Sequence, residues 1–166
     1  MSAEQPGVAS RVHLLLRAGG HMIVTAESLT GGQLAKRLTD VPGASDTFLG
    51  GVVTYATELK QTLLGVPDEV VKGPGVVSGE CAEAMATGAR ALTGATFALS
   101  TTGVAGPAPQ EDKPAGTVFV GIAGPGLKTS VALDLDGDRA SIQSQACTRA
   151  LEELERILRR EETAVG

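Results

Sequence analysis

Short apolar runs alternate along this chain with segments of helical periodicity, and that alternation restricts the fold more than any other feature. Residues 21–26, 47–57 and 95–101 are rich in apolar, β-branched or aromatic side chains, a pattern typical of buried strands. Stretches with apolar residues at helical spacing lie between them. A strand–helix–strand order with short connections predicts an α/β fold with a parallel sheet.

The remaining segments add helices at both ends and a hairpin. Helical patterns cover residues 8–19, 34–38, 58–64, 78–93 and 139–160, and glycine or proline follows most of them. Residues 117–123 and 128–135 are strand-like and flank a Gly-Pro-Gly turn, which indicates an antiparallel hairpin. We therefore expect helices on both faces of a mixed, mostly parallel sheet that contains one antiparallel strand.

Composition narrows the class of function. The 166 residues, 42% hydrophobic and 20% charged, suit a single globular domain over residues 1–166. The net charge of −5 and the few aromatic residues (three Phe, one Tyr, no Trp) argue against direct binding of nucleic acid or of anionic membranes. No segment has the length of a membrane span or the pattern of a targeting signal, so we expect a soluble, cytoplasmic protein.

The cysteines and other ligand-type residues predict no metal site. Cys81 and Cys147 lie far apart in helix-like stretches and fit no zinc spacing. Free thiols at these positions suit a reducing compartment. No set of His, Cys and carboxylates has the spacing of metal ligands, and we expect neither a metal nor another cofactor.

The segment TAESLTGG, residues 25–32, follows the first predicted strand and precedes a helix. Ser28 is expected just before the helix N-terminus, where free N–H groups and the helix dipole favour negative charge. Gly31 and Gly32 allow an anion or an oxyanion to approach the backbone closely. The alternative is structural, because Ser28 or Thr30 can simply cap the helix. The two roles are compatible.

The second polar segment, residues 50–60, holds the only tyrosine, Tyr55, at a strand end and Lys60 one turn into the next helix. Taken singly, a half-buried tyrosine and a solvated lysine are common. Neither His13 nor His21 suits a catalytic triad, so a serine nucleophile here needs Lys60 as its base. A neutral lysine near pH 7 requires a pKa lowered from ~10.4, at about 4–5 kcal/mol, which burial or a neighbouring cation can supply.

Two further segments hold groups suited to an anionic substrate. Residues 101–107 (TTGVAGP) and 113–117 combine hydroxyls with small residues at a strand end, which suits a phosphate cradle but equally a tight Gly/Pro loop. Arg139 follows Gly137 and Asp138 at the start of the last helix. Its guanidinium can bind a phosphate, although an exposed arginine without such a role is common.

Together these segments resemble the CinA C-terminal domain family, which includes a competence/damage-inducible protein and bacterial nicotinamide-nucleotide amidohydrolases. The matching segments are TAESLTGGQLAKRLTDVPGAS, FLGGVVTYATELKQTLLGV, GVVS, TTGVAGP, KPAGTVFVG and GDR, over about residues 8–158. The resemblance implies a three-layer α/β/α sandwich that hydrolyses the carboxamide of nicotinamide mononucleotide to nicotinic acid mononucleotide and ammonia. It also implies a small-molecule nucleotide as substrate and a homo-oligomer.

The resemblance assigns roles to individual residues. The nucleophilic serine of the family falls on Ser28, and the assisting tyrosine and lysine fall on Tyr55 and Lys60. The implied substrate-binding residues are Thr30, Gly31, Gly32, Thr102, Gly103 and Arg139. In the mechanism that follows, neutral Lys60, oriented by Tyr55, takes the proton of Ser28, and N–H groups near residues 30–32 hold the oxyanion.

The chain departs from the common family pattern near these residues, and other functions stay open for that reason. The departures are at Leu29, Ala56, Thr57, Gly79 and Gln143. A second hypothesis is a nucleotide- or partner-binding module of the same fold with little or no turnover. A third is a direct role in DNA uptake or repair, against which the acidic charge argues.

Overall fold

The computed structural model describes residues 5–165, which form strands and helices in alternation as far as the third strand. In chain order the elements are α1 (Val8–Gly19), β1 (Ile23–Glu27), α2 (Gln33–Thr39), the 3₁₀ turn η1 (Ala44–Asp46), β2 (Phe48–Val53), α3 (Thr57–Leu64), α4 (Asp68–Lys72), α5 (Gly79–Thr93), β3 (Phe97–Gly103), β4 (Thr117–Gly124), β5 (Leu127–Asp134) and α6 (Arg139–Val165). β4 and β5 form the predicted hairpin.

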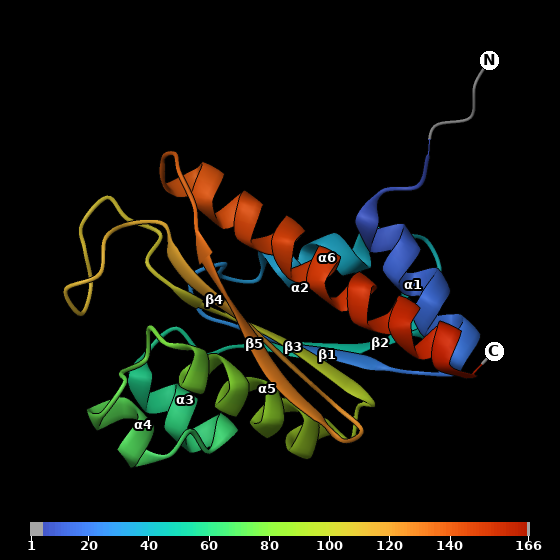
Figure 1. Ribbon diagram of the computed structural model, residues 1–166, viewed down its shortest axis with the longest axis horizontal. Helices are drawn as coiled ribbons and strands as arrows, with labels where there is room; N and C mark the ends of the chain where they lie inside the picture. The colour runs from blue at the N-terminus through green and yellow to red at the C-terminus, as the bar shows by residue number, and fades with distance from the viewer. Residues whose placement is uncertain (1–4, 166) are drawn as a thin grey trace.

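A five-stranded sheet in the order β2-β1-β3-β4-β5 lies at the centre of the molecule (Figure 1). β1 pairs in parallel with both β2 and β3, whereas β4 pairs antiparallel with β3 and with β5. Four strands therefore point one way and β4 points the other way, so the predicted mixed sheet is confirmed. Because β1, β2 and β3 are parallel, their carboxyl ends meet at one edge of the sheet.

Helices cover both faces of this sheet and complete three layers. α1, α2 and α6 lie on one face, and α3, α4 and α5 lie on the other (Figure 1). One apolar core joins residues such as Leu16, Leu99 and Leu154, and a second joins residues such as Val24 and Met85. β1 lies between two strands and between both helical layers, and all five of its residues are buried. The predicted α/β/α sandwich is confirmed.

Short-range chemistry sets several helix ends where the sequence predicts them. Gly20 follows α1 with φ = 67°, a left-handed conformation that glycine adopts without a Cβ clash. Ser78 Oγ accepts a hydrogen bond from the Cys81 N–H at 3.1 Å and caps α5. Both ends follow from signals within a few residues of the helix.

Two elements differ from the sequence prediction. The second strand ends at Val53 instead of residue 57. The chain enters α3 at Thr57, and Ala56 is already the N-cap residue of that helix. α4 was not predicted, since five residues are too few to show an apolar period. The early end of β2 places Tyr55 in the connection that leads to Lys60. Within residues 5–165, no helix is both long and apolar enough to cross a lipid bilayer.

Candidate active site

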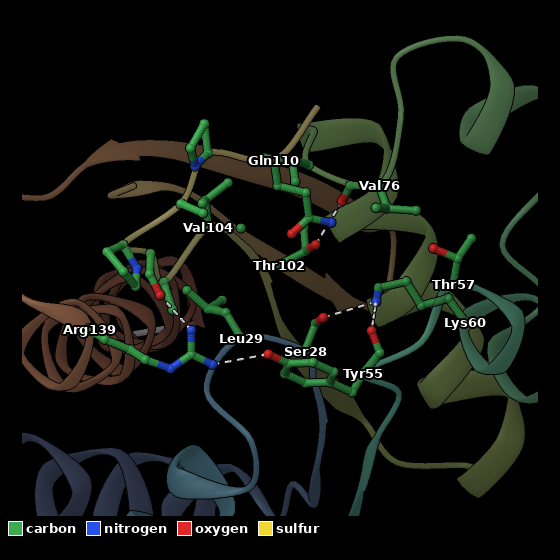
Figure 2. A pocket seen from close by; sticks show the side chains of 17 residues that line it. Ser28, Leu29, Tyr55, Thr57, Lys60, Val76, Thr102, Val104, Gln110 and Arg139 are labelled. Carbon is green, nitrogen blue, oxygen red and sulfur yellow. Dashed lines mark hydrogen bonds between the residues drawn. The ribbon is translucent and has the colours of Figure 1, made fainter. Parts of the chain in front are cut away.

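A cavity of about 330 Å³ lies where the carboxyl ends of β1, β2 and β3 meet (Figure 2). This volume falls in the range of about 300–1,000 Å³ that is typical of small-molecule sites. The turn after β1, the connection between β2 and α3, residues 76–77, the loop from residue 102 to residue 110, and Arg139 line the cavity. The polar segments that the sequence analysis singled out therefore converge on one site.

Ser28 and Lys60 are in direct contact in this cavity. The Lys60 Nζ donates to the Ser28 Oγ at 2.9 Å, although 32 positions separate the two residues. It also donates to the main-chain carbonyls of Thr54 at 2.8 Å and Tyr55 at 3.0 Å. Lys60 is 2% exposed and Ser28 is 8% exposed, so both polar groups lie inside the protein. The predicted nucleophile and base are thus placed within reach of each other.

The surroundings of Lys60 favour its neutral form. Burial is the largest influence on Lys60 and lowers its pKa below the usual value of 10.5, whereas Cys81 and Glu111 act in the opposite direction. A neutral amine has two N–H donors and one lone pair. Its two N–H groups match the two main-chain carbonyls, which leaves the lone pair for the hydroxyl hydrogen of Ser28. This arrangement suits transfer of that proton to Nζ.

Glu27 caps the helix that follows Ser28. Its buried carboxylate accepts hydrogen bonds from Thr30 Oγ1 at 2.6 Å and from three N–H groups at the start of α2, at 2.8–3.2 Å. A carboxylate there satisfies free N–H groups and is favoured by the helix dipole. The predicted cap by Ser28 or Thr30 is wrong. Thr30 Oγ1 binds Glu27 and Thr101, whereas the Ser28 hydroxyl is left for Lys60.

The two glycines after Ser28 shape the turn but do not line the cavity. Gly31 and Gly32 have φ values of 58° and 104°, which residues with a Cβ rarely adopt. The Gly31 N–H bonds to the Ser28 carbonyl at 3.1 Å, and the Gly32 N–H bonds to Glu27 at 3.2 Å. These two expected oxyanion donors are therefore occupied. The N–H groups of Leu29, directly after Ser28, and of Thr30 have no acceptor within residues 5–165.

Tyr55 contacts Lys60 through its main chain, not through its phenol. The phenol points to Arg139, whose guanidinium donates to the Tyr55 hydroxyl at 3.0 Å and to the Gly106 carbonyl at 2.6 Å (Figure 2). The group of Tyr55 that contacts Lys60 is therefore its carbonyl and not the phenol. Tyr55 and Arg139 are both exposed, so their guanidinium–hydroxyl contact is open to exchange with a ligand.

The end of β3 brings Thr102 and Gly103 to the cavity. Thr102 Oγ1 donates to the Val76 carbonyl at 2.7 Å, so its hydroxyl offers a ligand only acceptor capacity. A Cβ at residue 103 would lie 2.5 Å from the Thr117 carbonyl oxygen, so glycine is required there. Of the expected substrate-binding residues, Thr102, Gly103 and Arg139 line the cavity, whereas residues 30–32 lie outside its lining.

The loop from residue 104 to residue 116 contributes a residue that the sequence analysis missed. Gln110 lines the cavity and its side chain points toward Thr102 (Figure 2). The neighbouring Glu111 carboxylate holds the loop by accepting from the N–H groups of residues 76 and 77, at 3.1 and 2.8 Å. A loop glutamine carries no local signal of this role. The cap by Glu27, also missed, carries no local signal either, because Glu27 ends β1 and lies outside the first turn of α2.

The histidines and cysteines do not line the cavity. His13 is buried and contacts Thr47 Oγ1 and the Leu38 carbonyl. Cys81 and Cys147 are free, and burial raises the pKa of the first thiol to about 11 and that of the second to about 12. Within residues 5–165, no group of three or more His, Cys, Asp or Glu is placed to hold a metal ion.

Sequence comparison places the cavity within a known family. The family model described as the CinA C-terminal domain matches residues 6–158, a range that contains the whole cavity lining. The chain belongs to the CinA family. The resemblance drawn from the sequence segments is thereby confirmed.

Known CinA proteins resemble this chain in both sequence and structure. A CinA-like protein of Frankia casuarinae is 52% identical over 136 residues, which cover 82% of this chain and 31% of that protein. A CinA-like protein of Citrifermentans bemidjiense is 43% identical over 157 residues, which cover 94% of this chain and 38% of that protein. The chain thus spans about a third of the length of these relatives. The crystal structure of a competence-damaged protein (CinA) superfamily protein from Klebsiella pneumoniae 700603 matches with a TM-score of 0.90 and 34% identity, covering 92% of this chain and 96% of that one.

Proposed function

We propose that this CinA domain is an amidohydrolase that converts nicotinamide mononucleotide and water to nicotinic acid mononucleotide and ammonia. The proposal is carried by the buried contact between Ser28 and Lys60, in which two main-chain carbonyls accept the other N–H groups of Lys60. A serine beside a desolvated amine has the chemistry of a nucleophile with its general base. The resemblance to nicotinamide-nucleotide amidohydrolases supplies the choice of substrate.

The first half-reaction acylates Ser28. Lys60 Nζ takes the hydroxyl proton while Ser28 Oγ forms a bond to the carboxamide carbon. Negative charge collects on the carboxamide oxygen, and the unoccupied Leu29 N–H stabilises it, a contribution of about 3–4 kcal/mol for such a donor. The Lys60 ammonium then gives its proton to the amide nitrogen, the C–N bond breaks and ammonia leaves.

The second half-reaction releases the acid. Neutral Lys60 takes a proton from water, and the resulting hydroxide adds to the ester carbon. The bond between that carbon and Ser28 Oγ breaks, and Lys60 returns the proton to the serine. One water enters and one ammonia has left, so the amide becomes a carboxylic acid with both side chains restored.

The phosphate of the nucleotide is assigned to Arg139. Arg139 and Lys60 are the two cationic side chains of the cavity lining, and Lys60 is needed in its neutral form. In the free protein the Arg139 guanidinium binds two uncharged groups, which a phosphate outcompetes through charge-assisted hydrogen bonds. The N-terminus of α2 is an unsuitable phosphate site, because the Glu27 carboxylate already occupies it.

The test is ammonia release from nicotinamide mononucleotide by the purified protein and by Ser28→Ala. We expect the wild type to release ammonia and Ser28→Ala to lose at least about a thousandfold in kcat, because the nucleophile is gone. Ser10→Ala, a serine of α1 outside the cavity lining, is the matched control. Calorimetry should show that Ser28→Ala still binds the nucleotide. Full activity in Ser28→Ala would remove that residue from the mechanism.

A wild type that binds the nucleotide but releases no ammonia would favour the second hypothesis, a nucleotide-binding module of the same fold. The contacts of Arg139 would then still matter, whereas those of Lys60 would be structural. The same protein with nicotinamide riboside, which lacks the phosphate, tests whether binding depends on that group. Binding of both compounds with equal affinity would contradict the role given to Arg139.

A further inference from the structure

The side chain of Gln143, on α6, contacts the turn that holds the nucleophile. Its Nε2 donates to the Leu29 carbonyl at 2.8 Å, across 114 positions of sequence. Leu29 is 3% exposed and lines the same cavity as Ser28. Gln143 has no role in the reaction described above. The contact is nevertheless a direct link between α6 and the residue that follows the nucleophile.

In the turn from Ser28 to Gly31, the Leu29–Thr30 peptide makes no hydrogen bond to the main chain. The bond from the Gly31 N–H to the Ser28 carbonyl closes a four-residue turn with Leu29 and Thr30 at its centre. Neither central residue has a positive φ, which excludes the type II and primed turns. Turns of type I and type II differ in the orientation of the central peptide, here Leu29–Thr30. Gln143 binds the carbonyl of that peptide and holds one orientation.

This orientation bears on the donor assigned to the oxyanion. The Leu29 N–H shares a planar peptide with the Ser28 carbonyl, which is held by the Gly31 N–H. The Ser28 N–H is held in turn by the Thr101 carbonyl at 3.0 Å. The peptide before Ser28 is therefore anchored by β3, the peptide before Leu29 by the turn, and the peptide after Leu29 by Gln143. With the peptides on both sides of Leu29 held, its backbone has one conformation and its N–H one direction.

We propose that Gln143 is a positioning residue that holds the Leu29–Thr30 peptide and thereby keeps the Leu29 N–H directed at the oxyanion formed by Ser28. The inference rests on the proposed function, because it concerns the oxyanion of that reaction. The positioning role requires a hydrogen-bond donor at residue 143, because the group that Gln143 binds is the Leu29 carbonyl. A carboxylate in the same place offers acceptors only and repels the Leu29 carbonyl.

The same helix offers a matched control. Gln145 Nε2 also donates to a main-chain carbonyl, that of Asp136 at 2.7 Å, but Gln145 and Asp136 are both outside the cavity lining. Methionine has nearly the length and helix propensity of glutamine and has no N–H donor. The informative set is therefore Gln143→Met, Gln143→Glu and Gln145→Met.

Steady-state ammonia release from nicotinamide mononucleotide separates an effect on kcat from one on KM. Loss of one oxyanion donor lowers kcat by about 10²–10³. Gln143 does not contact the oxyanion and acts only through the peptide it holds, so a smaller effect is expected. We expect Gln143→Met to lower kcat by about 10–100-fold with KM within about twofold, and Gln143→Glu to lower kcat at least as much. Gln145→Met should keep the wild-type kcat, with a melting temperature equal to that of Gln143→Met. Wild-type kcat in Gln143→Met, or an equal loss in Gln145→Met, overturns the proposal.

A second measurement separates this proposal from the proposed substrate. An alkyl fluorophosphonate reacts with an activated serine: a bond forms between Ser28 Oγ and phosphorus, fluoride leaves, and the hydroxyl proton passes to Lys60. The phosphoryl oxygen then takes the place of the oxyanion. If the wild type releases no ammonia from the nucleotide, the substrate assignment fails, yet the rate of this adduct, read by intact mass, still tests Gln143. A slower rate in Gln143→Met than in Gln145→Met supports the positioning role, and equal rates or no Ser28 adduct at all overturn it.

Discussion

Replacing Lys60 with methionine removes the amine that contacts the Ser28 hydroxyl and leaves an unbranched side chain of similar length in its place. General-base catalysis contributes about 10²–10⁴ in rate, which corresponds to about 3–5 kcal/mol on the activation barrier. We expect kcat for ammonia release to fall by that factor. KM should change little, because the nucleotide is assigned to Arg139 rather than to Lys60.

The structure also indicates that this variant folds. It loses three hydrogen bonds of Nζ, to the Thr54 and Tyr55 carbonyls and to the Ser28 hydroxyl, each worth about 1 kcal/mol net. Against that loss, the fold no longer desolvates an amine, and methionine buries apolar surface at about 25 cal/mol per Å². We expect these opposing contributions to keep the free energy of unfolding of Lys60→Met within about 2 kcal/mol of the wild type. A loss of activity then reports on the base and not on the fold.

The pH dependence follows from the lowered pKa of Lys60. Between the folded pKa and 10.5, the unfolded chain binds more protons at this lysine than the folded protein does, so its contribution to stability rises with pH. Because the base must be neutral, kcat/KM rises with pH through the same folded pKa. Ammonia release and urea midpoints from about pH 6 to pH 10 should show both rises in the wild type and neither in Lys60→Met.

The control for these measurements is Lys36→Met, which removes an exposed lysine paired with Asp40 on α2. This variant should keep the wild-type kcat and both pH profiles. A Lys60→Met protein with more than about a tenth of the wild-type kcat would refute the assignment of Lys60 as general base. An unchanged rise of kcat/KM with pH in Lys60→Met would assign that rise to another group.

Three further substitutions test the cap, the phosphate site and the packing of α5. Glu27→Gln should lower the free energy of unfolding by about 1.5–3 kcal/mol in a urea titration, because one amide oxygen replaces a carboxylate that accepts from four donors; an equal loss in the exposed Glu58→Gln would contradict this. Arg139→Met should raise KM for nicotinamide mononucleotide at least about tenfold in the ammonia assay, and an unchanged KM would move the phosphate elsewhere. Gly88→Ala should cost about 1–3 kcal/mol in thermal unfolding, although alanine is the better helix former, because its Cβ would lie 1.9 Å from the Leu64 carbonyl oxygen. A stabilised Gly88→Ala would show that α3 moves aside freely.

Sequence patterns predicted most elements because their signals are local. The glycine after α1, the serine before α5 and the turn between β4 and β5 each act within a few residues. The end of β2 was missed because β-branched and aromatic residues continue past Val53 to residue 57, and the short α4 was missed because five residues are too few for an apolar period to appear. The order of strands in the sheet came from none of these signals, since pairing joins segments that lie far apart in the chain.

Local patterns suffice to show that polar segments follow three strands of a parallel sheet, and hence that Ser28 and Lys60 belong to one edge of it. Which groups are in contact at that edge depends on how the strands and helices pack. Glu27 caps α2, Tyr55 contacts Lys60 through its carbonyl, and Gln143 contacts the Leu29 carbonyl from α6. Several donors and acceptors near the turn compete for the same hydrogen-bond partners. Distances set by packed strands and helices, which no local pattern encodes, select among them.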